Sequence, residues 1–126
     1  MKENQTILII EDNDSFRSHL VEILTAQGYK VLEASNGEIG WNYVQHNPVD
    51  IVILDMIMPG KNGSWFVDCV RDNKEYKDLP IIIFTNLSHG ENIGKVITKG
   101  ISRMLIKEST SDSSLVQEIK DVLATG

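Results

Sequence analysis

Acidic, hydroxyl and ammonium side chains follow or close four separate apolar runs of this sequence, as Glu11, Asp12, Asp55, Thr85 and Lys107. Three carboxylates brought within several ångströms would repel one another, and at least one pKa would rise unless a cation neutralised them. Mg²⁺ is the economical cation, because it prefers octahedral oxygen coordination and usually combines a few carboxylates with waters and phosphate oxygens. Glu11, Asp12 and Asp55 therefore predict a magnesium site that leaves a position for a phosphoryl oxygen.

These residue types suit phosphoryl transfer to Asp55. A carboxylate is a competent nucleophile at neutral pH and forms an aspartyl phosphate. The transferring group needs little beyond positioning and charge neutralisation, which Mg²⁺ and Lys107 would supply. The Thr85 hydroxyl would project toward the same edge, where it can donate a hydrogen bond to the phosphoryl group. Lys107 is expected to pair with Asp55 at rest, because an unpaired buried ammonium group is costly.

Each of these residues has a plainer explanation when it is taken singly. Asp55 alone would be read as a turn cap, Thr85 as an ordinary strand residue and Lys107 as a surface lysine. Exposed loop charges would account for Glu11 and Asp12. The functional interpretation therefore depends on the strand ends converging.

The stretch from Val49 to Gly60 organises the chain around Asp55. Its apolar run of branched residues is short, which suits a strand buried on both faces. Pro59 stops the strand because proline has no N–H to give to the ladder, and Gly60 permits a turn. In open α/β sheets ligands bind beyond the carboxyl ends of the strands, and Asp55 stands at such an end.

Strand-like and helix-like segments alternate along the whole chain. Besides the Asp55 strand, strands are expected at Thr6–Ile10, Tyr29–Ala34, Leu79–Thr85 and Gly100–Lys107. Helices are expected over 15–27, from Ile39 to His46, over 63–73, over 88–99 and after a cap within Ser109–Ser114. This alternation predicts an α/β fold of the flavodoxin-like (βα)5 class, a doubly wound parallel sheet with strand order 2-1-3-4-5.

Composition narrows the class of protein. The chain has 126 residues, enough for one domain, and its 12 basic against 18 acidic residues give a net charge of -6. This balance argues against direct contact with nucleic acid, which favours a basic surface. No apolar run is long enough to span a membrane and no signal peptide is evident, so a cytoplasmic location is expected. The lone Cys69 cannot form a disulfide within the chain.

The ordered set of motifs resembles the receiver domains of two-component response regulators. The residues that carry the resemblance are Glu11-Asp12, Asp55 with Met58-Pro59 and Gly63, Thr85, and Lys107. Each motif is weak alone, whereas the set in this order is specific. The resemblance covers essentially the whole chain and implies a single receiver domain over 1–126, of the stand-alone type.

The resemblance implies a phosphorylation switch. Asp55 would accept a phosphoryl group from a histidine kinase, a phosphotransfer protein or a small phosphodonor, and Thr85 and Lys107 would hold it. The Mg²⁺ ligands implied are Glu11, Asp12, Asp55 and the backbone carbonyl of Ile57. Such a domain catalyses its own phosphorylation and slow dephosphorylation, so it is not an enzyme in the usual sense.

The same resemblance implies an output surface. Displacement of Thr85 and Lys107 would reshape the face formed by the fourth helix, fifth strand and fifth helix, where a downstream protein would bind. Candidate contact residues on that face are His89, Asn92, Lys95, Lys99 and Arg103.

The chain departs from the family pattern at the positions that transmit the signal. Glu108 follows Lys107 where proline is usual, and a trans Lys107–Glu108 bond is expected because a cis bond before a non-proline residue costs about 2.5–4 kcal/mol. Met104 stands at a usually aromatic position and Asn86 at a usually small one. Because methionine is flexible, a two-position aromatic rotamer cannot be the output signal.

Apolar residues flank the site where many receivers carry polar groups. Ile57 lies two residues past Asp55, and Leu87 lies two residues past Thr85. Both could obstruct an attacking water, which leads to the hypothesis of a comparatively long-lived phosphoaspartate.

Three alternatives remain on the sequence alone. A receiver-like module without phosphorylation, serving only protein interaction, is favoured by the altered switch positions and opposed by the complete acceptor set. A haloacid dehalogenase-type phosphohydrolase also uses aspartate, Mg²⁺, threonine and lysine, but it needs a second acid where this chain has Ile57. Nucleotide or flavin binding lacks support, because no glycine-rich phosphate loop follows the first strand.

Overall fold

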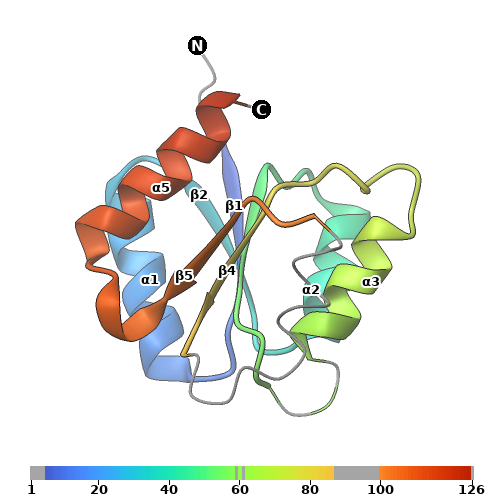
Figure 1. Ribbon diagram of the computed structural model, residues 1–126, viewed down its shortest axis with the longest axis horizontal. Helices are drawn as coiled ribbons and strands as arrows, with labels where there is room; N and C mark the ends of the chain where they lie inside the picture. The colour runs from blue at the N-terminus through green and yellow to red at the C-terminus, as the bar shows by residue number, and fades with distance from the viewer. Residues whose placement is uncertain (1–4, 59, 61, 87–99, 126) are drawn as a thin grey trace.

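The protein forms a parallel sheet with helices on both faces (Figure 1), seen here in a computed structural model that describes residues 5–58, 60, 62–86 and 100–125. The sheet has five strands in the order β2-β1-β3-β4-β5, which confirms the predicted strand order. The strands are β1 Thr6–Ile10, β2 Lys30–Ala34, β3 Ile51–Leu54, β4 Ile81–Thr85 and β5 Arg103–Ile106. The helices are α1 Asp14–Ala26, α2 Gly37–His46, α3 Gly63–Arg71, the 3₁₀ turn η1 Lys107–Ser109 and α5 Asp112–Thr125.

The three central strands consist almost entirely of apolar residues because both of their faces are covered, the exceptions being Thr6 and Thr85. Every residue of β1, β3 and β4 is buried, whereas the marginal strands β2 and β5 keep partly exposed positions. Successive side chains point to opposite faces. Leu8 and Ile10 therefore pack toward α2 and α3, and Ile7 and Ile9 pack toward α1 and α5 (Figure 1).

Asparagine side chains begin three of the helices. Asn13, Asn36 and Asn62 each accept a hydrogen bond from a backbone N–H in the first turn of α1, α2 and α3. These bonds satisfy donors that have no partner within a helix. At the other end of α1 the chain reverses at Gly28, whose φ of 94° is a left-handed conformation that suits glycine. Asn13 and Gly28 therefore mark the two ends of α1.

The register of the sheet brings the strand ends to one edge. Ile10 lies opposite Leu54, Leu54 lies opposite Ile83, and Thr85 lies opposite Ile106. The residues that follow these positions leave the sheet side by side. The chemistry-bearing residues predicted at strand ends are thus gathered by pairing between strands that are far apart in sequence.

Element boundaries differ from the prediction by a few residues. The fifth strand begins at Arg103 rather than Gly100, because Gly100 has a φ of 87° that is incompatible with a strand. Lys107 lies in η1 instead of closing the strand, and helix α3 ends at Arg71. The helix predicted over 88–99 lies outside the described residues.

Within the described part of the chain, no helix combines the length and the apolar character needed to cross a membrane.

Candidate functional site

Asp55 lies at the centre of the site, directly after β3. Its backbone N–H donates to the carbonyl of Ile10, so the end of β3 is fixed to β1. The side chain is buried, with 7% of its residue surface exposed. Its Oδ1 accepts a hydrogen bond from the Thr85 hydroxyl at 2.8 Å and a longer one from the Ile57 N–H at 3.3 Å. Its Oδ2 faces Lys107 Nζ at 3.4 Å. Both carboxylate oxygens are therefore oriented.

Glu11, Asp12 and Asp55 form an acidic cluster. One carboxylate oxygen of each lies within 4.8 Å of the others, a span that a single cation can bridge. Glu11 is buried, and burial is the main cause that raises its pKa, opposed by hydrogen bonds from Lys107 and the Asn13 N–H. Asp12 is exposed. A set of hard oxygen donors with one solvent-facing member fits Mg²⁺, which retains waters when bound.

Lys107 links the acidic residues to helix α1. Its Nζ donates to Glu11 Oε1 at 2.5 Å and lies 4.6 Å from the centre of the Phe16 ring. The prediction paired Lys107 with Asp55. The structure contains that contact, but the shorter bond is to Glu11, and Lys107 lies in the turn η1.

Two residues of helix α1 that the sequence analysis missed support the site. Phe16 lies beneath Lys107 and also contacts Phe84, with ring centres 5.8 Å apart. Arg17 donates to the backbone carbonyl of Glu11 at 2.7 Å. In the sequence Phe16 belongs to an apolar helical stripe that indicates only core packing, so no signal marked its contact with an ammonium group.

Gly63 allows helix α3 to begin against the acceptor loop. A Cβ atom at this position would lie 2.8 Å from both the carbonyl oxygen of Asp55 and the Cα of Met56. Both neighbours are backbone atoms that cannot rotate away. This close approach gives a physical reason for the glycine that the sequence analysis grouped with Asp55.

Ile57 projects from the same loop into solvent. Its residue surface is 58% exposed, which is unusual for a large apolar side chain two residues from a buried carboxylate. Pro59 and Leu87, which the sequence analysis also placed near the site, lie outside the described residues, as do the candidate output residues His89, Asn92, Lys95 and Lys99.

The departures from the receiver pattern are visible on β4, β5 and η1. Met104 is half-buried and packs against the core beneath α3, and it pairs with Ile83 in the sheet. Asn86 is exposed at the end of β4. The Lys107–Glu108 bond is trans, as predicted, and the chain continues into η1.

The fold and the site together define a class of protein, that of flavodoxin-like α/β domains with a buried aspartate at the carboxyl edge of the sheet. Residues 7–120 match the family model of the response regulator receiver domain, and the chain belongs to this family. The family is that of two-component signalling, which the sequence analysis predicted.

Relatives of known name support this assignment. The chain is 32% identical over 122 residues to a chemotaxis protein CheY homolog of Campylobacter jejuni, covering 95% of this chain and 93% of that protein. It is 29% identical over 112 residues to the CAI-1 autoinducer sensor kinase/phosphatase CqsS of Vibrio cholerae, covering 88% of this chain but 16% of that protein. Related sequences thus occur both as near full-length matches and as a small part of a larger protein.

Solved structures also support the assignment to the receiver-domain family. The chain is similar to the chemotaxis response regulator CheY4 of Vibrio cholerae with a TM-score of 0.84 and 27% identity, covering 94% of this chain and 98% of that one. It is also similar to a putative response regulator from Chloroflexus aurantiacus with a TM-score of 0.87 and 29% identity, covering 97% and 99% of the two chains.

Proposed function

We propose that this chain is a phosphorylation-dependent signalling switch that accepts a phosphoryl group on Asp55, from a histidine kinase or a phosphotransfer protein, in the presence of Mg²⁺. The observation that carries the proposal is the convergence on Asp55 of two further carboxylates, a hydroxyl and an ammonium group. Residues 1–126 are proposed to act as a single receiver domain, in the cytoplasm where such phosphodonors are found.

The acidic cluster would hold the metal. Glu11, Asp12 and Asp55 supply carboxylate oxygens, and the backbone carbonyl of Ile57 is the proposed fourth protein ligand. When bound, Mg²⁺ neutralises negative charge on the carboxylates and on the incoming phosphoryl oxygens.

The protein groups would then carry out the transfer. A carboxylate oxygen of Asp55 forms a bond to phosphorus while the bond from phosphorus to the donor nitrogen or oxygen breaks, and the leaving group departs with that electron pair. The Thr85 hydroxyl and the Lys107 ammonium group already contact Asp55, so each needs only a small shift to donate to the new phosphoryl oxygens. Attack by water on phosphorus would slowly restore the free carboxylate.

Intact-mass spectrometry tests the proposal. The protein is incubated with acetyl phosphate or phosphoramidate, with and without Mg²⁺, and the mass of one phosphoryl group is expected on the wild type only when Mg²⁺ is present. Asp55→Asn should gain none, and Asp72→Asn, which changes an exposed acid at the end of α3, should behave as wild type. Equal labelling of wild type and Asp55→Asn would overturn the assignment of the acceptor.

The second candidate is a receiver-like protein-interaction module that is not phosphorylated. The observation in its favour is Met104, which is packed against the core at the position where an aromatic switch residue is expected. The intact-mass experiment described above separates the two functions, because the interaction module would gain no phosphoryl group from acetyl phosphate or phosphoramidate at any Mg²⁺ concentration. Its downstream partner would use the exposed surface of β5 and α5, where Arg103 pairs with Glu118.

A further inference from the structure

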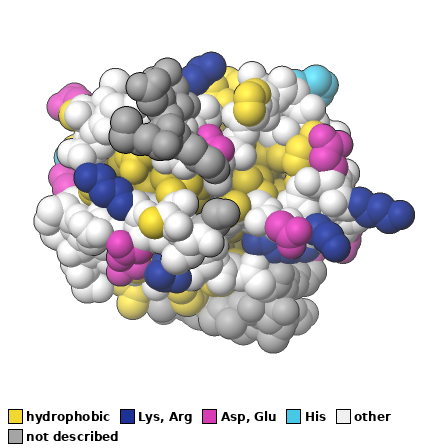
Figure 2. Space-filling view, turned by 90° about the horizontal axis from the view of Figure 1, so that it is seen from above, with side chains coloured by type: hydrophobic (Ala, Val, Ile, Leu, Met, Phe, Trp, Pro, Cys, Tyr) yellow, Lys and Arg dark blue, Asp and Glu magenta, His cyan; other side chains and the backbone are white. Residues whose placement is uncertain are grey.

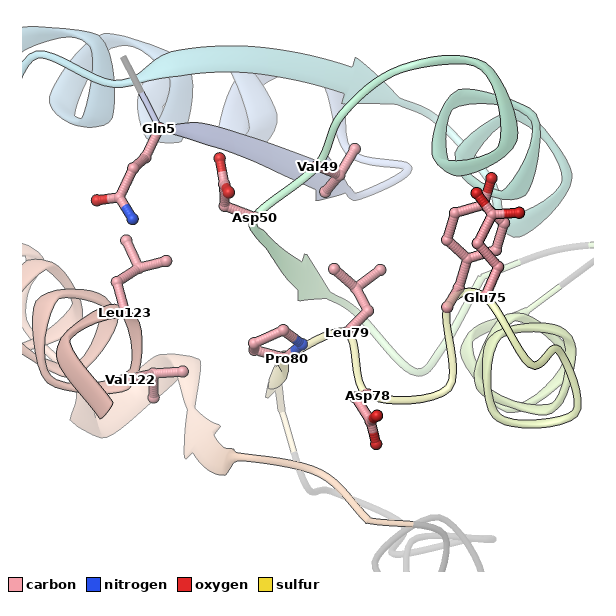
Figure 3. A pocket seen from close by; sticks show the side chains of 10 residues that line it. Gln5, Val49, Asp50, Glu75, Asp78, Leu79, Pro80, Val122 and Leu123 are labelled. Atoms are coloured by element: carbon pink, nitrogen blue, oxygen red, sulfur yellow. The ribbon is translucent and has the colours of Figure 1, made fainter. Parts of the chain in front are cut away.

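A cavity lies at the edge of the sheet opposite Asp55. It has a volume of about 360 Å³ and is lined by residues that precede strands or end helix α5 (Figure 3). Its lining residues are Gln5 before β1, Val49 and Asp50 before β3, the segment 75–76 and 78–80 before β4, and Val122 and Leu123 of α5. Because the site described above lies at the carboxyl ends of the strands, the two sites are on opposite edges of the molecule.

The floor of this cavity is apolar. Leu79, Pro80, Val122 and Leu123 line the space between α5 and the start of β4 (Figure 3). Seen from this edge, hydrophobic side chains show in the hollow between charged ones (Figure 2). Cavities that hold small organic ligands usually measure about 300–1,000 Å³ and combine an apolar lining with a few polar groups. The volume admits a molecule of roughly one ring and a short chain.

The charged groups that line the cavity are all of one sign. Among its described lining residues, Asp50, Glu75 and Asp78 are acidic and none is lysine or arginine. Asp50 is oriented, because its Oδ2 accepts a 2.7 Å hydrogen bond from the backbone N–H of Thr6. Asp78 is partly offset by the nearby Arg71, and Glu75 lies across the cavity from Asp50 (Figure 3), so Asp50 is the carboxylate on which the charge argument rests.

We propose that this cavity binds a small organic cation, of the class in which an apolar body carries one ammonium group. The apolar body would pack between Leu79, Pro80 and Leu123, and the ammonium group would face Asp50. Charge complementarity excludes carboxylates and phosphates, and the apolar floor disfavours a bare metal ion. The proposal does not depend on phosphorylation of Asp55, because it uses the other edge of the sheet.

Titration followed by amide NMR tests this proposal with 2-phenylethylamine as the probe. Saturable shifts are expected at residue 5, residues 49–50, residues 75–80 and residues 122–123. The neutral analogue 2-phenylethanol should bind about fivefold more weakly, the loss expected for one partly exposed ion pair, and 3-phenylpropionate should not bind. Equal affinity for the amine and the alcohol would overturn the assignment of a cation site. Shifts centred on Glu11 and Asp55 would also overturn it, because the amine would then be binding the other acidic cluster.

Variants of the lining residues distinguish binding in the cavity from attraction to the net charge of the protein. Asp50→Asn keeps an oxygen that can accept from Thr6 and should weaken amine binding about fivefold without affecting the alcohol. Leu123→Trp should abolish binding of both compounds, because the larger half-buried side chain fills the cavity. The control Glu22→Gln removes the same charge from the exposed face of α1 and should change nothing. If Asp50→Asn and Glu22→Gln weaken binding equally, the attraction is to net charge and the proposed site is wrong.

Discussion

At the scale of single residues, the Asp55 carboxylate is held by donors on both oxygens before any phosphoryl group arrives. Thr85 is buried, with 1% of its surface exposed, and its hydroxyl donates to Asp55 Oδ1 at 2.8 Å. Because these groups are already oriented in the folded protein, less reorganisation is needed at the moment of reaction. The preorganisation predicts how individual substitutions should behave.

Thr85→Val should slow phosphorylation of Asp55 while leaving the fold intact. The substitution removes the 2.8 Å hydrogen bond and keeps the shape of the side chain. A bond to a charged group contributes about 1.5–3 kcal/mol, so a roughly tenfold to hundredfold lower rate is expected from acetyl phosphate with Mg²⁺. Thr6→Val is the control, because Thr6 is also a buried strand threonine but lies at the opposite edge of the sheet. A rate for Thr85→Val that matches Thr6→Val would show that the hydroxyl has no role in transfer.

Ile57 is expected to prolong the life of the phosphoaspartate. Ile57 is two residues past the acceptor and its side chain is exposed, so it is available to obstruct the approach of water. Replacement by serine, Ile57→Ser, should shorten the half-life measured by loss of phosphoryl mass in Mg²⁺. The control is Ile39→Ser, which replaces another large exposed apolar side chain, on helix α2, and should leave the half-life unchanged. A wild-type half-life of seconds or less would contradict the hypothesis.

Gly63→Ala should destabilise the protein more than Gly40→Ala. A methyl group at Gly63 meets backbone atoms of Asp55 and Met56, whereas a methyl group at Gly40 meets Cγ1 and Cδ1 of the Ile10 side chain, and side-chain atoms adjust more readily than backbone atoms. The expected loss in free energy of unfolding for Gly63→Ala is about 1–3 kcal/mol. Urea midpoints for the two variants measure the difference. Equal midpoints would mean that the loop after β3 can move without cost.

At the scale of elements, helix α3 is tied to the strands by one side chain. The Arg71 guanidinium donates to the carbonyls of Lys77, Leu79 and Gly100, which joins the end of α3 to the segments that lead into β4 and β5. Burial lowers the pKa of Arg71, but its charge is retained because a guanidinium group ordinarily has a very high pKa. One residue therefore replaces the backbone hydrogen bonds that irregular segments lack.

Arg71→Met should destabilise the fold by about 1.5–3 kcal/mol, since three carbonyls lose a charged donor. Arg103→Met is the control, because Arg103 forms a partly exposed ion pair with Glu118 that contributes at most about 1 kcal/mol. The two are compared by urea denaturation. A smaller loss for Arg71→Met than for Arg103→Met would contradict the anchoring role.

The elements show which features of the fold the sequence could predict. Apolar runs that end in charged residues identify buried parallel strands, so the strand order and the grouping of Glu11 and Asp55 followed from the sequence. The direction of the Lys107 side chain did not, because it depends on the turn η1 rather than on the strand. Phe16 was missed because an apolar helical stripe does not tell which aromatic ring lies beneath a charge. The cavity at the opposite edge was missed because its lining comes from several connections that share no pattern.

At the scale of the whole molecule, binding at the acidic cluster is coupled to stability. The cluster is built from the ends of β1 and β3, which are adjacent only in the folded chain. A cation that binds the native state and not the unfolded chain stabilises it by about 2.7 kcal/mol at a concentration one hundred times its Kd. One carboxylate oxygen each of Glu11, Asp12 and Asp55 lies within 4.8 Å of the others, close enough for a single cation to neutralise them.

Mg²⁺ is therefore expected to raise the thermal unfolding midpoint of the wild type in a concentration-dependent way, and Asp12→Asn should remove most of that rise. Asp12 is exposed and is the member of the cluster that can be changed with the least effect on packing. Asp14→Asn changes a neighbouring exposed carboxylate that pairs with Arg17 instead, and it should keep the full response to Mg²⁺. Differential scanning calorimetry at increasing MgCl₂, with NaCl added to hold the ionic strength constant, measures all three proteins. If Asp12→Asn and the wild type respond equally, the ion is acting on the general negative charge of the chain, and the proposed magnesium site is wrong.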